Sequence, residues 1–179
     1  IPHGLGKRPK WISIKSRTET EGWHVMSVLI SGNANGGLIL NDTNAEYTLG
    51  TNNTDTSQID TTNIHVKTSG NVNTDAQNYV AYCFAEIPGF SQFGNYKGNG
   101  NSDGPVIYTG FKPAFIIGKA TSRVDVWWMH DTKRSTFNPI DDRLMPHANN
   151  AEGEEWDIDY YSNGFKIRDT DAQANGSGE

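Results

Sequence analysis

The segment Pro9-Lys10-Trp11-Ile12-Ser13-Ile14-Lys15 recurs in similar form as Pro113-Ala114-Phe115-Ile116-Ile117-Gly118-Lys119, at an offset of 104 (113 − 9). Other pairs follow in the same order: Trp23 with Trp127, Asn44-Ala45-Glu46 with Asn150-Ala151-Glu152, Ile59-Asp60 with Ile158-Asp159, and Thr74-Asp75-Ala76-Gln77 with Thr170-Asp171-Ala172-Gln173. The offset drifts along the chain, as it does when surface loops change length while strands do not. We therefore predict two equivalent halves, residues 1–90 and 106–179, joined by a Gly/Asn-rich connector over residues 91–105.

The composition predicts strands rather than helices. Asn, Gly and Thr make up 53 of the 179 residues, and these residues favour turns over helix interiors. Ten short runs rich in β-branched and aromatic residues lie between the turn residues, which is typical of an antiparallel sandwich or barrel. These runs are residues 11–14, 23–30, 37–40, 63–67, 79–84, 106–108, 114–117, 124–129, 157–161 and 164–168. We expect one β-sandwich domain over residues 1–179, with at most one helical turn around Asp141–Leu144.

The repeat also predicts an incomplete second half. Thr74–Gln77 leads directly into the apolar run Tyr79–Phe84, whereas no counterpart of that run follows Thr170–Gln173. An unpaired buried edge is unfavourable, so we expect either a truncated sequence or a strand supplied by a neighbouring domain or another subunit of a homo-oligomer.

Charge and cysteine content exclude several classes of protein. The formal net charge is −6 and the pI is about 5.3, which argues against a nucleic-acid-binding surface. The single cysteine, Cys83, allows neither an internal disulfide nor a four-ligand zinc site. No apolar run approaches the roughly 18 residues of a membrane span, so we expect no membrane insertion.

A family resemblance is carried by Tyr79–Gly100, Asp103-Gly104-Pro105 and Tyr108–Phe115, and continues through Asn150-Ala151-Glu152, Ser162–Lys166 and Arg168. Together these segments resemble a domain common in long virion and tail proteins of marine tailed bacteriophages. That domain is described as similar to the laminin-G or concanavalin-A-like jelly roll and has no established activity. The resemblance implies an all-β, concanavalin-A-like sandwich, a location in the virion, and a structural or adhesion role in a tail fibre.

Carboxylates alternate with apolar residues in Glu155-Trp156-Asp157-Ile158-Asp159, so the three acids are predicted to share one face of a strand. This spacing is similar to the acidic strand of jelly-roll glycosidases, in which two carboxylates roughly 5 Å apart act as nucleophile and acid/base. The last position is Asp where that pattern has Glu, and the other half keeps only Asp60. A solvated strand face is therefore the preferred interpretation, and Glu155, Asp157 and Asp159 are the catalytic alternative.

Adjacent aromatic residues suggest a sugar-binding platform. Trp127 and Trp128 must face opposite sides of a strand, and the match of Trp23 with Trp127 favours Trp127 as the core residue. We therefore predict an outward-facing Trp128 that stacks on a sugar ring, with Tyr160 and Tyr161 as further ligand-binding candidates.

The connector residues Asn99, Asn101 and Asp103 carry short oxygen-bearing side chains between glycines, an arrangement that can wrap a calcium ion. A tight turn between the halves is the preferred interpretation, and no other cofactor is expected. The partners we expect are host cell-surface polysaccharide or other virion proteins. The sequence thus favours a non-enzymatic, carbohydrate-binding adhesion module, with a polysaccharide-degrading glycanase or a ligand-free scaffold or decoration domain as alternatives.

Overall fold

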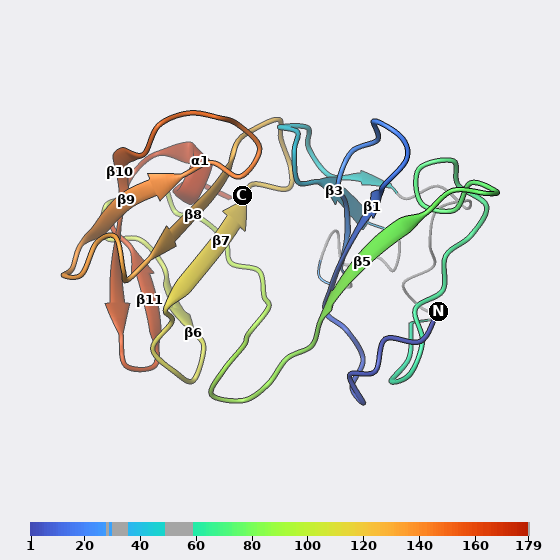
Figure 1. Ribbon diagram of the computed structural model, residues 1–179. Helices are drawn as coiled ribbons and strands as arrows, with labels where there is room; N and C mark the ends of the chain where they lie inside the picture. Colours follow the sequence, from blue (N-terminus) through green and yellow to red (C-terminus); the bar gives the residue numbers. More distant parts are fainter. Residues whose placement is uncertain (28, 30–35, 49–58, 179) are drawn as a thin grey trace. The chain divides into compact units, whose positions relative to one another are not determined.

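A computed structural model describes residues 1–27, 29, 36–48 and 59–178 (Figure 1). The chain divides into two compact units, Ile1–Ile87 and Pro88–Glu179, which we call unit 1 and unit 2. Each contains an antiparallel sheet, and in the described residues the only helix is α1 (Ala172–Asn175). The protein is therefore all-β, as predicted. None of the described helical segments is long and apolar enough to cross a lipid bilayer.

Unit 1 contains a sheet with the strand order β4-β3-β2-β1-β5 in its described part. Its strands are β1 (Trp11–Ser16), β2 (His24–Met26), β3 (Gly36–Ile39), β4 (Tyr47–Thr48) and β5 (Tyr79–Phe84). Side chains alternate between the two faces of each strand. One face carries a cluster formed by the buried residues Ile12, Ile14, Met26, Ile59, Ile64 and Val72.

Unit 2 contains a sheet with the strand order β6-β11-β10-β9-β8-β7 in its described part. Its strands are β6 (Val106–Tyr108), β7 (Phe115–Lys119), β8 (Trp127–Asp131), β9 (Ile140–Leu144), β10 (Gly153–Tyr161) and β11 (Gly164–Ile167). Its core is formed by the buried residues Trp128, Ile140, Trp156, Ile158, Tyr160, Phe165, Ile167 and Ala174.

Two hairpins, one in each unit, have the same strand register. In unit 1, Ile12 pairs with Met26 and Ile14 with His24. In unit 2, Ile116 pairs with His130 and Gly118 with Trp128, which is the same pairing shifted by 104 residues. The β1–β2 hairpin and the β7–β8 hairpin therefore have one register.

The loops of these two hairpins are closed by equivalent lysines. Lys15 Nζ donates hydrogen bonds to the carbonyl oxygens of Ser16 (2.8 Å) and Glu19 (3.0 Å). Lys119 Nζ donates to those of Ala120 (2.6 Å) and Arg123 (3.2 Å), one and four residues later as in unit 1. The repeat thus extends to a side chain that stabilises its own loop.

The connector is part of unit 2 rather than a simple link between the halves. Tyr96 packs against the core of unit 2, and its hydroxyl donates to the carbonyl oxygen of Ala174 (2.5 Å). The backbone N–H of Asn99 donates to Oδ1 of Asn175 (2.9 Å), a residue with no exposed surface. The boundary of the units therefore lies between Ile87 and Pro88, before the predicted connector begins. The prediction of one sandwich over residues 1–179 stays a prediction.

Two predicted elements were wrong, and one strand was not predicted. Residues 63–67 form no strand, and Asn63 makes an isolated bridge with Pro2. Residues 47–48 and 140–144 form β4 and β9, although the latter segment was expected to form a helical turn. The strand β9 forms because β8 and β10 pair with its two edges, and this pairing outweighs the weak local preference of its charged sequence.

Candidate functional site

The predicted acidic residues lie on β10, which has a bulge at its centre. The register between β10 and β9 shifts between Glu154 and Ile158, and Trp156 has a φ of 63°. A positive φ is rare for a bulky residue and marks a locally constrained backbone. From Trp156 to Tyr160 the strand alternates as predicted, with Trp156 and Ile158 buried and Asp157 and Asp159 on the opposite face.

The three carboxylates have different partners. Glu155 Oε2 lies 2.5 Å from Nη2 of Arg143. Asp159 Oδ2 accepts a hydrogen bond from Nη1 of Arg168 (2.9 Å). Asp157 has no ion pair within the part of the chain that the structure describes. The face that the sequence predicts therefore contains two charge-neutralised acids and one acid without a cation.

Burial and the neighbouring carboxylates of Asp141, Asp169 and Asp159 raise the pKa of Asp157. Both effects disfavour the charged form of the acid. Asp157 therefore binds a proton more readily than a free aspartate does.

A groove of about 690 Å³ runs beside Asp157 within unit 2. Its polar lining consists of Asn150, Glu154, Glu155, Asp157, Asp169, Asp171, Gln173 and Arg143. The bulge of β10 supplies three of these side chains, and the segment leading into α1 supplies Asp169 and Asp171. Asp159 is not among the lining residues. The structure thus brings Glu155 and Asp157 together in one groove and leaves Asp159 outside it.

Arg143 is the residue of this site that sequence reasoning missed. It comes from β9, is only 6% exposed, and lies with its guanidinium carbon 4.1 Å from the ring centroid of Trp156. Its Nε and Nη1 are buried and have no hydrogen-bond partner among the described residues. A buried guanidinium with unpaired donors is costly, and the ion pair with Glu155 and the contact with Trp156 offset part of this cost. No sequence signal pointed to Arg143, because its segment was expected to be a helical turn.

The predicted aromatic platform is corrected by the structure. Trp128 is 1% exposed and Tyr160 3% exposed, and both belong to the core of unit 2. The expectation of an outward-facing Trp128 was wrong, because both tryptophans of β8 are buried: Trp127 is 2% exposed, and Trp128 belongs to the core cluster of unit 2. Tyr161 is 37% exposed, so it remains available for contact with a ligand.

Other aromatic side chains are exposed instead. Tyr82 on β5 is 50% exposed and stacks against Trp23, with ring centroids 5.9 Å apart and an interplanar angle of 28°. The outward orientation of Tyr82 was not predicted. This stacked pair belongs to unit 1.

The whole chain, residues 1–179, matches the family described as "Domain of unknown function (DUF7483)". The chain belongs to the DUF7483 family. Neither the curated proteins nor the solved structures contain a match.

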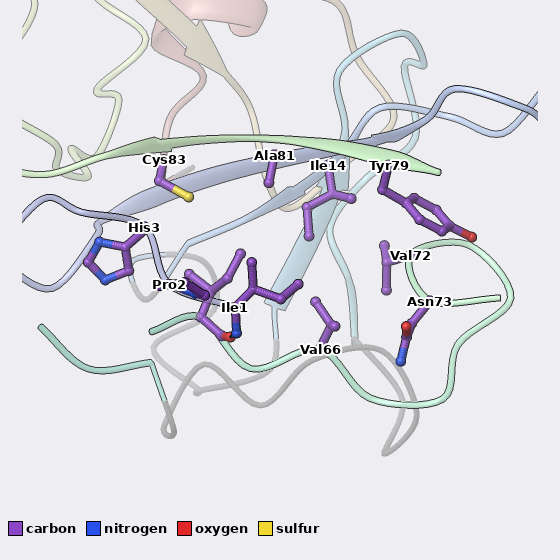
Figure 2. A pocket seen from close by; sticks show the side chains of 11 residues that line it. Ile1, Pro2, His3, Ile14, Val66, Val72, Asn73, Tyr79, Ala81 and Cys83 are labelled. Carbon is purple, nitrogen blue, oxygen red and sulfur yellow. Dashed lines mark hydrogen bonds between the residues drawn. The ribbon is translucent and has the colours of Figure 1, made fainter. Parts of the chain in front are cut away.

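Unit 1 of this DUF7483 chain contains a second cavity, of about 390 Å³ (Figure 2). Ile14, Tyr79, Ala81 and Cys83 of β1 and β5 line it on the sheet side. Figure 2 shows Ile1, Val66 and Val72 across the cavity from these strands. Burial raises the pKa of the Cys83 thiol, which disfavours a reactive thiolate. The cavity combines these apolar side chains with the polar groups of His3, Asn73 and Tyr79.

The predicted calcium ligands of the DUF7483 chain hold its connector together. Asn99 Oδ1 accepts hydrogen bonds from the N–H of Asn101 (3.0 Å) and from Nδ2 of Asn175 (3.1 Å). The carboxylate of Asp103 accepts from Nζ of Lys166, which lowers the pKa of Asp103. Within the described residues, no group of three or more His, Cys, Asp or Glu side chains is placed to hold a metal ion. Calcium binding stays a prediction.

Proposed function

We propose that the chain is a non-enzymatic carbohydrate-binding module of a bacteriophage virion, and that the groove of unit 2 is its binding site. The observation that carries this proposal is the lining of the groove, where carboxylates and amides surround the ion pair of Arg143 with Glu155. A polyhydroxylated ligand both donates and accepts hydrogen bonds, so it can satisfy both kinds of group. The resemblance to phage tail domains supports the virion location and the adhesion role.

The charge of the groove indicates the kind of sugar. Glu154, Asp157, Asp169 and Asp171 accept hydrogen bonds, while Asn150 and Gln173 both donate and accept. The acids outnumber the single cation, Arg143, so an anionic polysaccharide would be repelled. We therefore expect neutral or amino sugars of a host cell-surface polysaccharide as ligands.

The placement of the acids supports binding over hydrolysis. A glycosidase of the jelly-roll type uses two carboxyl groups, one ionised and one protonated, that flank the bond to be cleaved. Glu155 forms an ion pair with Arg143, and Asp159 does not line the groove. Of the three predicted acids, only Asp157 therefore lies in the groove without an ion-pair partner. The proposal includes the concanavalin-A-like jelly roll, for which the two antiparallel sheets give support at the level of fold class.

The test combines a glycan array with calorimetric titration of the glycans that bind. Asp157→Ala should weaken binding at least 10-fold because it removes a hydrogen-bond acceptor. Asp157→Asn should change binding by less than 3-fold because the amide oxygen still accepts. Asp75→Asn, at an exposed position of unit 1, is the matched control. Binding by the wild type that Asp157→Ala leaves unchanged would contradict the assignment of the groove.

A glycanase is the second candidate, and the raised pKa of Asp157 favours it, because a general acid must be protonated at the working pH. The same variants separate the two functions. Release of reducing sugar by the wild type, abolished in Asp157→Asn, would establish the enzyme and overturn the binding module. Neither binding nor release on a broad glycan panel would leave the scaffold or decoration domain as the function.

A further inference from the structure

The strands β1 and β7 hold equivalent positions in the two units but differ in what lies beside them. Each pairs with the next strand in the same register, offset by 104 residues. On its other edge, β1 pairs with β5 along its whole length, from Trp11 with Phe84 to Ser16 with Tyr79. In the described part of unit 2, β7 is the last strand of its sheet (Figure 1). The place that β5 takes in unit 1 therefore has no strand in unit 2.

The backbone geometry shows which groups this edge presents. Thr132 N–H donates to the carbonyl oxygen of Ala114 (3.1 Å), so Ala114 faces β8. The backbone N–H and C=O groups of successive residues in an antiparallel strand point to opposite edges. Those of Ile116 and Gly118 therefore point to β8, as in Ala114, while those of Phe115 and Ile117 point to the outer edge. The same alternation holds in unit 1, where Arg17 N–H donates to the carbonyl oxygen of Asn78 beside β5 (2.8 Å).

The edge of β7 has little of the protection that usually prevents pairing. Sheet edges are commonly protected by short length, proline or charge. In the described part of unit 2, the opposite outer strand, β6, has three residues, whereas β7 has five. Its segment Phe115-Ile116-Ile117-Gly118 contains neither proline nor charge, and the charged Lys119 ends the strand. Phe115 is also 54% exposed.

We propose that the outer edge of β7 binds an extended segment that adds a strand antiparallel to β7, with the side-chain pattern of β5. In β5, Ala81 and Cys83 are small and lie toward the cavity of unit 1, while Tyr82 and Phe84 project from the other face, each 50% exposed. Small side chains on the core face suit unit 2 because Gly118 lies there against Trp128. Aromatic side chains on the other face lie beside Phe115.

The register of the added strand follows from unit 1. Ile12 pairs with Cys83 and Trp11 with Phe84. Shifted by 104 residues, the cysteine of a β5-like segment would lie opposite Ile116 and its last aromatic residue opposite Phe115. The Ile12–Cys83 pair is of the non-hydrogen-bonded kind, in which the two Cα atoms are closest, about 4.5 Å apart. A disulfide can form across such a pair.

The probe is a synthetic peptide with the sequence of residues 78–86, added to the full chain carrying Cys83→Ser. Amide hydrogen exchange should slow at least 10-fold at Phe115 and Ile117 when the peptide is present. In Ile117→Pro this protection should be lost, because proline has no N–H to donate to the added strand. The pairing of β7 with β8 should remain, because the N–H of Ile117 does not point to β8. A near-ultraviolet circular dichroism spectrum equal to that of the parent would show that this variant keeps the packing of Trp128.

Cross-linking tests the register independently of hydrogen exchange. Ile116→Cys in the Cys83→Ser chain should form a disulfide with the peptide cysteine in an oxidised glutathione buffer, at least 10-fold faster than Ile117→Cys, whose side chain lies on the other face. No protection of Phe115 and Ile117, or equal cross-linking at both positions, would overturn the proposal. Protection of the same amides by concentration-dependent dimerisation without peptide would also overturn it, in favour of a second copy of the chain at this edge.

Discussion

Gly118 of β7 lies opposite Trp128 of β8, and a Cβ atom on Gly118 would come within 2.2 Å of Cζ2 of the indole. The equivalent positions in unit 1 are held by Ile14 and His24. The two hairpins therefore have the same backbone register, but they differ in the sizes of the paired side chains. Unit 1 pairs two side chains of medium size, and unit 2 pairs a glycine with a tryptophan. In unit 2 nearly all of that volume belongs to Trp128, so the position opposite must be glycine.

Gly118→Ala should lower the free energy of unfolding by about 2 kcal/mol, because the buried indole has no room to move away. Denaturant titration followed by tryptophan fluorescence measures this loss. Trp128→Phe removes the atoms that would clash, so the double variant should lose less stability than the sum of the two single variants. Additive losses would contradict the steric explanation.

Asn175→Ala should destabilise unit 2 by about 1–3 kcal/mol, because the buried amide of Asn175 joins the connector to α1. Its Nδ2 donates to the carbonyl oxygens of Asn101 (2.8 Å) and Asp169 (2.7 Å). Hydrogen exchange should speed up in residues 98–104. Lys97→Ala, at an exposed position of the same connector, is the control. Unchanged exchange in residues 98–104 would contradict the role of Asn175.

His130 should make stability depend on pH. Burial, with Arg134 and Arg143 nearby, lowers its pKa to about 4, against the opposing effects of Asp141 and Asp131. The unfolded chain binds a proton on this residue below about pH 6.5, and the folded chain only below about pH 4. The free energy of unfolding should therefore fall by roughly 3 kcal/mol as the pH falls across this range.

The His130→Leu variant tests that pH dependence. It should flatten the curve between pH 6.5 and pH 4, and it removes two buried ring nitrogens that have no hydrogen-bond partner in the described residues. Denaturant titrations at pH 7, 5.5 and 4.5 provide the comparison. A His130→Leu curve as steep as that of the wild type would assign the dependence to other groups.

Lys15→Met and Lys119→Met should each lower the free energy of unfolding by about 1–2 kcal/mol. The reason is that each lysine donates two hydrogen bonds to carbonyl oxygens of its own hairpin loop. Methionine keeps much of the aliphatic stem, so the loss reports on the ammonium group. Lys133→Met, at an exposed position, should change stability by less than about 0.5 kcal/mol. Equal effects of all three substitutions would indicate that the loop bonds contribute nothing specific.

The register of the two hairpins was predictable from two constraints: the spacing shared by the two halves, and the burial of one face of each strand. Trp11 and Phe115, with the lysines that follow, show the same spacing in both halves, and a strand shifted by one residue would expose its core face. In contrast, Ile140–Leu144 has three charged residues at its centre and no repeated counterpart of similar sequence. Only its pairing with β8 and β10 makes it a strand.

The candidate site was predicted in part for the same reason. Alternation placed Asp157 and Asp159 on one face of β10, but the bulge at Trp156 depends on the register with β9, which no local pattern contains. The groove also needs Arg143 and the segment before α1, which are distant in the sequence. The prediction for Trp128 failed because alternation places Trp127 and Trp128 on opposite faces of β8 but does not show that both side chains are buried.

Because the connector packs against unit 2, it determines where the second half can be separated from the first without losing its fold. A cassette cut where the recurring sequences begin, at residue 106, would leave behind the backbone that satisfies the buried amide of Asn175 and the Tyr96 side chain that packs with Ala174. A cut before Pro88 keeps them. The second half should therefore fold after transfer to another protein only when residues 88–105 are transferred together with residues 106–179.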